Sequence, residues 1–217
     1  MADRKRTARA AFILLALLVL VSASLYRRPW VGSRMIWLSG LGWLAFNFYW
    51  GAAAKNSSKA KKSESAESRR VHQYLLLSGL LFLFVTVPGL RWRFLPLVWF
   101  VPVAGLVLQA ACGAFGVWAR RHLGAHWSGE ITIKEEHRLI RSGPYRLVRH
   151  PMYTAWLGMY AGPAIVSGEA HALLGLLLAV VAYWRKIRLE EAVLIEGFGA
   201  EYAAYRRQTW KLLPGLF

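Results

Sequence analysis

Polar side chains suited to chemistry gather in two stretches of this 217-residue chain, residues 118–153 and 183–206. The first stretch ends on Arg149, His150, Pro151 and Tyr153. Proline is favoured as the first residue of a helix, so we expect His150 at a helix cap, where backbone N–H groups and the helix dipole attract an anion. Residues of these types also anchor proteins at a membrane interface, and the residues alone leave both interpretations open.

The second stretch contains an acidic pair, Glu190 and Glu191, within a basic segment. Lys186 and Glu190 are one helical turn apart, which places them on one helix face. A solvated helix end with a surface ion pair of little energetic value would show the same pattern. An apolar block, Pro151–Trp184, separates the two stretches and is broken near Ser167–Ala170. A hairpin there would bring the two stretches together.

Residue counts and motifs disfavour several other chemistries. His122 and His126 have HxxxH spacing, but the chain has six histidines, fewer than membrane di-iron oxygenases need. The single cysteine, Cys112, excludes an intramolecular disulfide, and Cys/His zinc spacings do not occur. Neither a GxGxxG after a strand nor a P-loop motif is present. We therefore expect no metal site and no nucleotide-binding fold.

The elements that position these residues are expected to lie in a membrane. The chain has 28 Lys and Arg against 11 Asp and Glu, a net charge of +17, yet 56% of its residues are apolar. A basic nucleic-acid-binding protein or a disordered basic chain would be far less apolar. Apolar runs that approach or reach the length of a membrane span occupy Ala11–Tyr26, Met35–Ala54, Val71–Leu90, Leu97–Ala119 and Pro151–Trp184.

These runs predict an all-α, multi-span integral membrane protein with about six transmembrane helices, the last two of them a short hairpin. After a break at Gly197-Phe198-Gly199, a cytoplasmic C-terminal amphipathic helix is expected over Glu196–Arg207. The basic start and short first run also fit a cleaved signal peptide, although the later runs favour an anchor. We expect residues 1–117 to form about four spans with a basic loop at 55–70, and residues 118–217 to form a catalytic region.

The distribution of charge predicts the orientation. If the N-terminus is cytoplasmic and the spans alternate, most of the 28 basic residues fall on the cytoplasmic side, as the positive-inside rule requires. Both termini are then cytoplasmic. The net charge is explained by this orientation and by attraction to anionic lipid, so it does not indicate nucleic-acid binding. The expected partner is therefore the lipid bilayer. The location would be the plasma (inner) membrane in a prokaryote and the endoplasmic reticulum in a eukaryote.

The pattern over about residues 118–214 resembles the isoprenylcysteine carboxyl methyltransferase family, and membrane phospholipid N-methyltransferases share much of it. The matching residues are Arg121, Leu123, Gly124, Trp127, Ser128, His137, Leu139, Ile140, Gly143, Pro144, Tyr145, Arg149, His150, Pro151, Met152, Tyr153, Glu190, Glu191, Leu194, Phe198, Gly199, Glu201, Tyr202 and Tyr205. Within residues 1–117 the likeness is limited to hydrophobic spans.

The resemblance implies a membrane-embedded, S-adenosylmethionine-dependent methyltransferase without a Rossmann domain. Cofactor-binding residues carried over by motif position are Glu130, His137, Leu139, Ile140, Tyr145, His150, Pro151, Tyr153 and Glu190. Glu130 stands where the eukaryotic enzymes carry a glutamine. Lys186 holds the position of a basic substrate-contacting residue, and the neighbouring Arg185 and Arg188 are further substrate-binding candidates.

The chemistry of the acceptor decides which residues would act. A carboxylate is already ionised at pH 7 and needs only a cation to orient it, which Lys186, Arg185 or Arg149 would supply. An amine acceptor would need a base, for which Glu191 and His150 are the candidates. The leading hypothesis is carboxyl O-methylation of an isoprenylcysteine-like or other lipophilic acceptor that enters from the bilayer. The alternatives are a phosphatidylethanolamine N-methyltransferase, a small thiol or amine methyltransferase, and a non-catalytic membrane scaffold.

Overall fold

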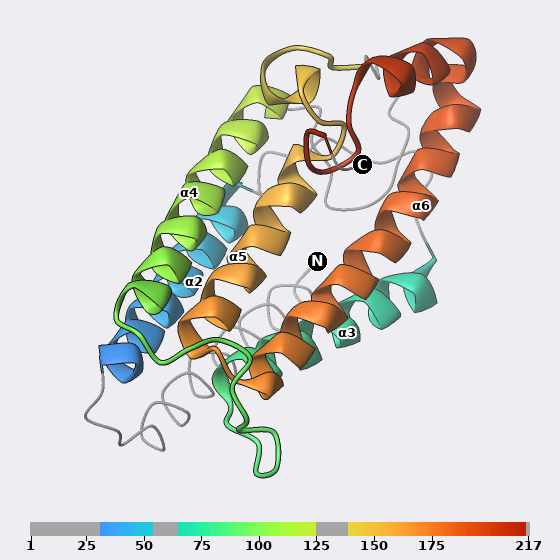
Figure 1. The fold of residues 1–217 in the computed structure, drawn as a ribbon. Coiled ribbons are helices and arrows are strands. Elements are labelled where there is room, and N and C mark those ends of the chain that lie inside the picture. The colour runs from blue at the N-terminus through green and yellow to red at the C-terminus, as the bar shows by residue number, and fades with distance from the viewer. Residues whose placement is uncertain (1–30, 54–64, 125–138, 216–217) are drawn as a thin grey trace.

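A computed structural model describes residues 31–53, 65–124 and 139–215 (Figure 1). Its elements are α2 (Val31–Ala53), α3 (Ala66–Phe84), α4 (Phe100–Leu123), the 3-10 helix η3 (Gly143–Arg146), α5 (Pro151–Ser167) and α6 (Ala170–Gln208). Within these ranges the only β-type pairings are two isolated bridges. The prediction of an all-helical protein is therefore confirmed for the described residues.

The helices follow the apolar runs with one clear difference. Helix α3 ends at Phe84, whereas the run that predicted it continues to Leu90. The next residue, Val85, is extended and opens a β-branched segment that leads to Pro88, and neither favours a helix. At its other end α3 begins inside the stretch 55–70 expected to be a loop, because the Ser65 hydroxyl accepts a hydrogen bond from the Ser68 N–H and caps the helix. The run Ala11–Tyr26 lies outside the described residues.

The hairpin of α5 and α6 begins at Pro151 and turns at Ser167–Ala170, as the sequence predicts, but α6 continues well past Trp184, the predicted end of the apolar block. Pro151 is the first residue of α5, His150 is its N-cap, and the helix ends at Gly168, whose φ of 64° is in the left-handed region. Helix α6 is interrupted at Gly199, where φ is 50° and ψ is −123°. The last part of α6 therefore leaves the direction of its first part (Figure 1), as the predicted break requires.

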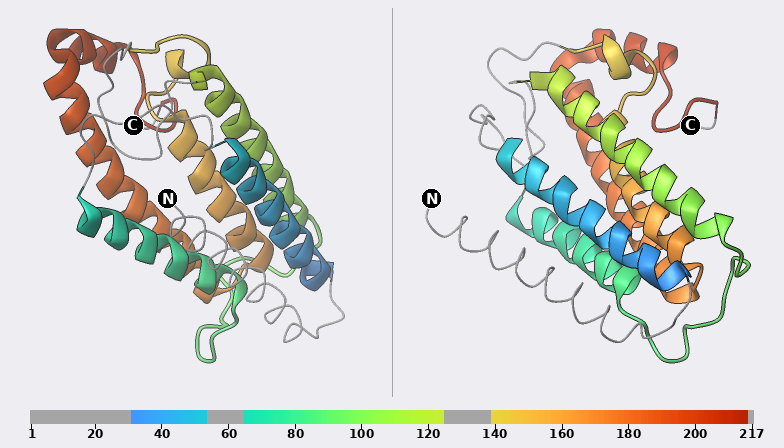
Figure 2. Two further views of the ribbon diagram at one scale, coloured as in Figure 1. Left: turned by 180° about the vertical axis from the view of Figure 1, so that it is seen from behind. Right: turned by 90° about the vertical axis from the view of Figure 1, so that its left-hand side faces the viewer.

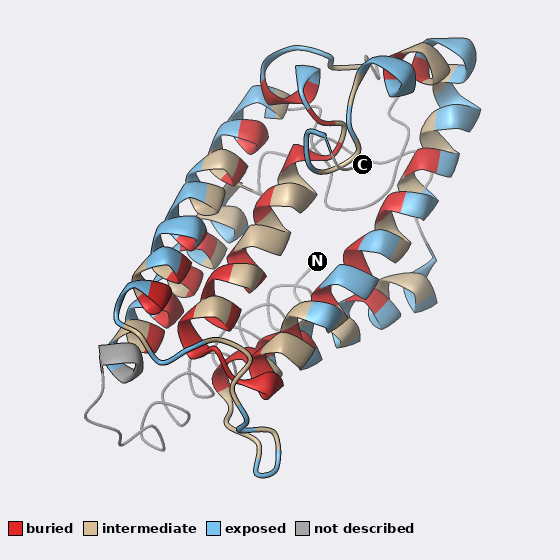
Figure 3. Cartoon of the chain, viewed as in Figure 1, coloured by how far each residue is buried: buried red, intermediate tan, exposed pale blue. Residues whose placement is uncertain are grey.

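Helix α4 is the single described helix that meets a strict test of length and apolar composition for a membrane span. The other expected spans stay predictions. Figure 3 shows exposed residues along the outer sides of the helices. Large apolar side chains are among the exposed residues, including Phe48 at 71%, Val107 at 63% and Val181 at 55% exposure. Exposed apolar faces of this extent are typical of proteins that contact lipid or a partner.

Small residues allow the helices to approach closely. A Cβ on Gly105 of α4 would lie 2.6 Å from the Gly162 carbonyl oxygen of α5, and a Cβ on Gly175 of α6 would lie 2.5 Å from the Gly79 carbonyl oxygen of α3. Such glycine contacts are a common way to pack helices in membranes. Figure 2 shows α2, α4 and α5 side by side, with α3 against α6.

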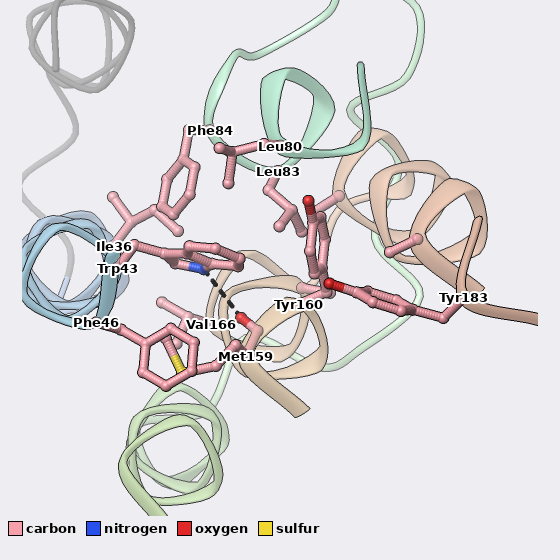
Figure 4. Close-up of a cluster of buried hydrophobic side chains, with 13 residues drawn as sticks. Ile36, Trp43, Phe46, Leu80, Leu83, Phe84, Met159, Tyr160, Val166 and Tyr183 are labelled. Carbon is pink, nitrogen blue, oxygen red and sulfur yellow. Dashed lines mark hydrogen bonds between the residues drawn. The ribbon is translucent and has the colours of Figure 1, made fainter. Parts of the chain in front are cut away.

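The core lies where α2, α3, α5 and α6 meet (Figure 4). Trp43 is almost fully buried and donates a hydrogen bond from Nε1 to the Met159 carbonyl oxygen at 2.9 Å. The Tyr160 hydroxyl likewise donates to the Leu76 carbonyl oxygen at 2.8 Å. Buried polar groups between spans must be satisfied internally because lipid offers no partners, and these side chains meet that condition.

A second polar group fixes the far end of the hairpin. Glu169 precedes α6 and lies 3.7 Å from the Arg93 guanidinium and 3.3 Å from His171 Nε2. The backbone pairs as well, since the Ala170 N–H donates to the Trp92 carbonyl oxygen at 2.9 Å. These contacts tie the hairpin turn to the α3–α4 connection, at the end of α5 opposite His150.

Candidate functional site

The two polar stretches of the sequence meet at the open end of the α5–α6 hairpin (Figure 1). Glu191 is the centre of this group, and its side chain is 9% exposed. Its Oε1 accepts a hydrogen bond from Arg149 Nε at 3.0 Å and lies 3.3 Å from His150 Nε2. Its Oε2 lies 3.9 Å from Arg206 Nη2 and from Lys211 Nζ. One buried carboxylate thus organises four basic side chains.

The chain after α6 returns to cover the start of α5, and we call residues 209–212 the C-terminal strap. The Arg149 and His150 N–H groups donate to the carbonyl oxygens of Trp210 and Lys211 at 2.8 and 3.2 Å. Arg149 Nη1 also donates to the carbonyl oxygen of Thr209. The anion expected at this cap would therefore not meet the N–H groups of Arg149 and His150, because the strap already binds them.

Glu190, next to this cluster, faces a different set of side chains. Its Oε2 lies 3.7 Å from His150 Nδ1, and the His150 ring stacks on the Tyr153 ring with centroids 5.5 Å apart. Three buried polar atoms here have no hydrogen-bond partner among the described residues: Glu190 Oε2, the Tyr145 hydroxyl and the Tyr202 hydroxyl. An acceptor and two hydroxyls left in this state indicate a site built for a polar ligand.

The tyrosines of this site stay protonated at neutral pH. Burial, followed by the negative charge of Glu190, raises the pKa of Tyr145 above its ordinary value. Burial also raises the pKa of Tyr205 to about 12. Tyr205 uses its proton to donate to the Tyr145 carbonyl oxygen at 2.6 Å, which holds η3 against the last part of α6. Tyr145 is thereby fixed as a neutral donor close to Glu190.

Glu191 has the opposite shift. Burial alone would raise its pKa, but the hydrogen bonds and charges of His150 and Arg149 outweigh burial and lower the pKa to about 2. The folded protein therefore holds Glu191 as a carboxylate over the whole neutral and mildly acidic range. A group with so low a pKa is a weak base.

This shift predicts how acid affects stability. Because the folded-state pKa is below the ordinary 4.5, the contribution of Glu191 is complete above about pH 4.5 and is lost as pH falls towards 2. The full contribution of the Glu191 carboxylate to the free energy of unfolding is about 3 kcal/mol. The measurement is the difference in free energy of unfolding between wild type and Glu191→Gln in detergent, followed from pH 7 to 3. A difference that stays constant down to pH 3 would reject the assigned shift.

The remaining predicted residues are placed unequally. Leu139 and Ile140 are half-buried just before η3. Arg185 donates from Nη2 to the Ser68 hydroxyl at 2.7 Å and so ties α6 to the start of α3. Lys186 is half-buried and Arg188 is exposed. Glu130 and His137 lie outside the described residues, and Pro151 begins α5 as stated above.

Several contributors to the site were not assigned from the sequence. Tyr202 and Tyr205 belong to the tail motif that carries the family resemblance, so a signal existed, but nothing gave them a role. Arg206 and Lys211 are two more basic residues in a basic segment, and only the fold brings them to Glu191. The strap has no sequence pattern that predicts its return to α5.

Comparison with known proteins agrees with the sequence resemblance. Residues 103–196 match the sequence model of the isoprenylcysteine carboxyl methyltransferase (ICMT) family. A probable protein-S-isoprenylcysteine O-methyltransferase of Oryza sativa subsp. indica is 29% identical over 145 residues, which cover 65% of this chain and 76% of the rice protein. Methanethiol S-methyltransferase 2 of Bradyrhizobium diazoefficiens is 41% identical over 75 residues, but these cover 34% of this chain and 27% of that protein.

The fold has a solved counterpart. The structure of the eukaryotic intramembrane Ras methyltransferase ICMT aligns with a TM-score of 0.63 over 94% of this chain and 74% of that chain, at 16% sequence identity. At this identity the likeness concerns the fold, and the fold is that of a membrane protein. The resemblance found in the sequence is thus confirmed, since residues 103–196 match the model of the isoprenylcysteine carboxyl methyltransferase family and curated relatives carry the same name.

Proposed function

We propose that the protein is an integral-membrane, S-adenosylmethionine-dependent methyltransferase that methylates the carboxylate of a lipophilic acceptor. The observation that carries the proposal is the polar site at the open end of the α5–α6 hairpin. There Glu190 Oε2 and two tyrosine hydroxyls are buried without a hydrogen-bond partner among the described residues, inside or beside the segment that matches the family.

The side chains present fit the methyl donor. S-adenosylmethionine supplies an electrophilic methyl group on a cationic sulfonium, so the chain's task is binding and alignment. Glu190 is suited to its ammonium or ribose hydroxyls, and Tyr145 and Tyr202 offer neutral donors to its polar atoms. The stacked rings of His150 and Tyr153 form an aromatic wall beside Glu190. Positioning of two reactants alone can lower a barrier by about 7–11 kcal/mol.

The state of Glu191 favours a carboxylate acceptor. An amine acceptor arrives protonated and needs a base with a pKa near the working pH, whereas the pKa of Glu191 lies at about 2. We assign Arg149 and Glu191 to holding the helix start, because they bind each other and the strap. Arg185 is engaged with Ser68. We assign Lys186 to the acceptor carboxylate because, by the family resemblance, it holds the position of a basic substrate-contacting residue.

A second candidate is methylation of a small thiol. The observation that favours it is the 41% identity to a methanethiol S-methyltransferase over 75 residues. That segment is short in both chains, so it supports a shared cofactor site more strongly than a shared acceptor.

The test offers methyl-labelled S-adenosylmethionine to the purified protein with one acceptor at a time. The acceptors are N-acetyl-S-farnesylcysteine, phosphatidylethanolamine and methanethiol. We expect base-labile label in the farnesylcysteine, because a methyl ester hydrolyses in base. Label confined to the phospholipid or to the thiol would replace the carboxylate assignment. Absence of saturable cofactor binding would reject every enzymatic candidate and leave the non-catalytic scaffold.

The membrane arrangement belongs to the same proposal. We propose about six spans, cytoplasmic termini, spans over residues 1–117 and a catalytic region over 118–217. The C-terminal part of α6 and the strap then lie at the cytoplasmic surface, where Lys186, Arg206 and Lys211 agree with the positive-inside rule. Cysteine accessibility labelling of the two hairpin ends would test this orientation.

A further inference from the structure

Three large apolar side chains are exposed beside the polar site, and we call them the interfacial patch. They are Leu147 at 49%, Trp210 at 47% and Leu213 at 46% exposure. Leu147 directly follows η3, whereas Trp210 belongs to the C-terminal strap and Leu213 follows the strap. The Trp210 N–H donates to the Leu147 carbonyl oxygen at 3.3 Å, which joins the two segments. Exposed apolar side chains gathered in this way mark a surface that contacts lipid or a partner.

Two contacts place the interfacial patch at the boundary of the apolar block Pro151–Trp184. The Thr154 hydroxyl, in the first turn of α5, donates to the carbonyl oxygen of Leu212 at 2.7 Å. Lys211 Nζ lies 4.7 Å from the centroid of the Trp184 ring, at the other end of the block on α6. The strap thus runs past the start of α5 (Figure 1), at the level where the apolar sequence of both helices ends. In a membrane protein that level corresponds to the lipid headgroups.

The residue types around the interfacial patch suit an anionic lipid surface. Tryptophan is enriched at the level of the headgroups, and Trp210 is an exposed aromatic residue of the strap. Arg146 is exposed next to Leu147, and Arg207 is exposed just before the strap. A surface that combines apolar side chains with arginines binds anionic lipid through both burial and charge. Lipid rather than a protein is therefore the expected occupant of the patch.

The main chain connects the interfacial patch to the polar site. The N–H groups of Arg149 and His150 donate to the carbonyl oxygens of Trp210 and Lys211, at 2.8 and 3.2 Å. His150 is the N-cap of α5, and its Nδ1 lies 3.7 Å from Glu190 Oε2. A contact that holds the strap in place from outside the protein therefore also holds the residues at the start of α5.

We propose that the interfacial patch inserts into the headgroup region of an anionic phospholipid bilayer and so holds the strap against the start of α5. The three apolar side chains supply the buried contacts, and the exposed Arg146 and Arg207 pair with lipid phosphates. The lipid composition then changes how firmly Arg149 and His150 are held. This inference goes beyond the proposed function, because neither the insertion nor its effect on α5 requires methyl transfer.

The first test measures the depth of the interfacial patch in a bilayer. A nitroxide spin label is attached to Leu213→Cys of the full chain, in which Cys112→Ser removes the native thiol, in nanodiscs of phosphatidylcholine and phosphatidylglycerol. Relaxation by oxygen reports lipid, and relaxation by a nickel chelate reports water. Val181→Cys gives the lipid reference and Ile195→Cys the water reference, because these side chains are 55% and 41% exposed within and beyond the apolar block. We expect the ratio of oxygen to nickel relaxation at residue 213 to lie above the ratio at residue 195, towards that at residue 181. A ratio no higher than that at residue 195 would overturn the proposal.

The second test measures the coupling of the patch to α5. Amide hydrogen exchange of Arg149 and His150 is compared between nanodiscs of phosphatidylcholine alone and nanodiscs that also contain phosphatidylglycerol. We expect exchange to be about fivefold slower with the anionic lipid, the factor that corresponds to about 1 kcal/mol for one basic residue at such a surface. The double variant Arg146→Gln/Arg207→Gln should lose this difference, whereas Arg91→Gln, which replaces an exposed arginine of the α3–α4 connection, should keep it. Equal exchange in the two bilayers, or an unchanged difference in the double variant, contradicts the proposal whether or not the protein methylates a carboxylate. Thermal unfolding midpoints of the variants identify any loss of fold.

Discussion

Replacement of Glu191 by alanine is expected to lower the free energy of unfolding by about 3–5 kcal/mol. The reason is that the basic side chains around Glu191 lose their carboxylate partner. Arg149, whose side chain is 8% exposed, loses its 3.0 Å carboxylate partner, and the buried His150 loses one of two. A buried charge without a partner is more costly than the pair was favourable. The strap would loosen as well, because Arg149 connects Glu191 to Thr209.

The matched control is Glu201→Ala. Glu201 also pairs with an arginine, Arg141, but its side chain is 54% exposed and that of Arg141 is 39% exposed. An exposed pair is worth at most about 1 kcal/mol. Unfolding followed by intrinsic tryptophan fluorescence in detergent compares the two variants. If Glu191→Ala costs no more than Glu201→Ala, the cluster does not hold the helix start together.

Glu190→Gln is expected to weaken S-adenosylmethionine binding by about tenfold to a hundredfold, since a hydrogen bond to a charged group contributes about 1.5–3 kcal/mol. The substitution removes the charge and keeps the shape. The substitution is expected to change the free energy of unfolding little. The 3.7 Å contact between Glu190 and His150 is long, and Glu190 Oε2 has no hydrogen-bond partner among the described residues. Isothermal titration of the purified variant gives the dissociation constant.

Glu196→Gln provides the control for this experiment. Glu196 is an exposed residue of the same helix, so its replacement changes the net charge equally without reaching the site. A Glu190→Gln dissociation constant equal to that of Glu196→Gln would remove Glu190 from the cofactor site. An unfolding midpoint close to that of wild type, measured without cofactor, would show that any loss of affinity is not a loss of fold.

Local rules were sufficient for much of the fold. Pro151 at a helix start and Gly168 at a helix end define α5 by their backbone preferences, so the hairpin could be predicted. Gly199 marks the break in α6 for the same reason. The end of α3 at Phe84 was missed, because an apolar run does not distinguish a helix from the extended, β-branched segment that follows it.

The sequence predicted many of the residues of the candidate site but only some of the contacts between them. The acidic pair and the cap residue His150 were recognisable from residue type and position. Glu191 holds Arg149, whereas Glu190 lies beside His150 and keeps a buried oxygen without a hydrogen-bond partner among the described residues, and this difference depends on which face of α6 each occupies. The return of the strap to α5 depends on contacts between distant segments, which residue spacing along the chain does not encode.

The central claim is that the methyl donor binds at the open end of the α5–α6 hairpin. The most direct test is an experimental structure of the full chain with S-adenosylmethionine bound. We expect the cofactor to contact Glu190 and Tyr145, with Glu191 still paired to Arg149. A cofactor bound between α2 and α4, or one that makes no contact with Glu190, would contradict it.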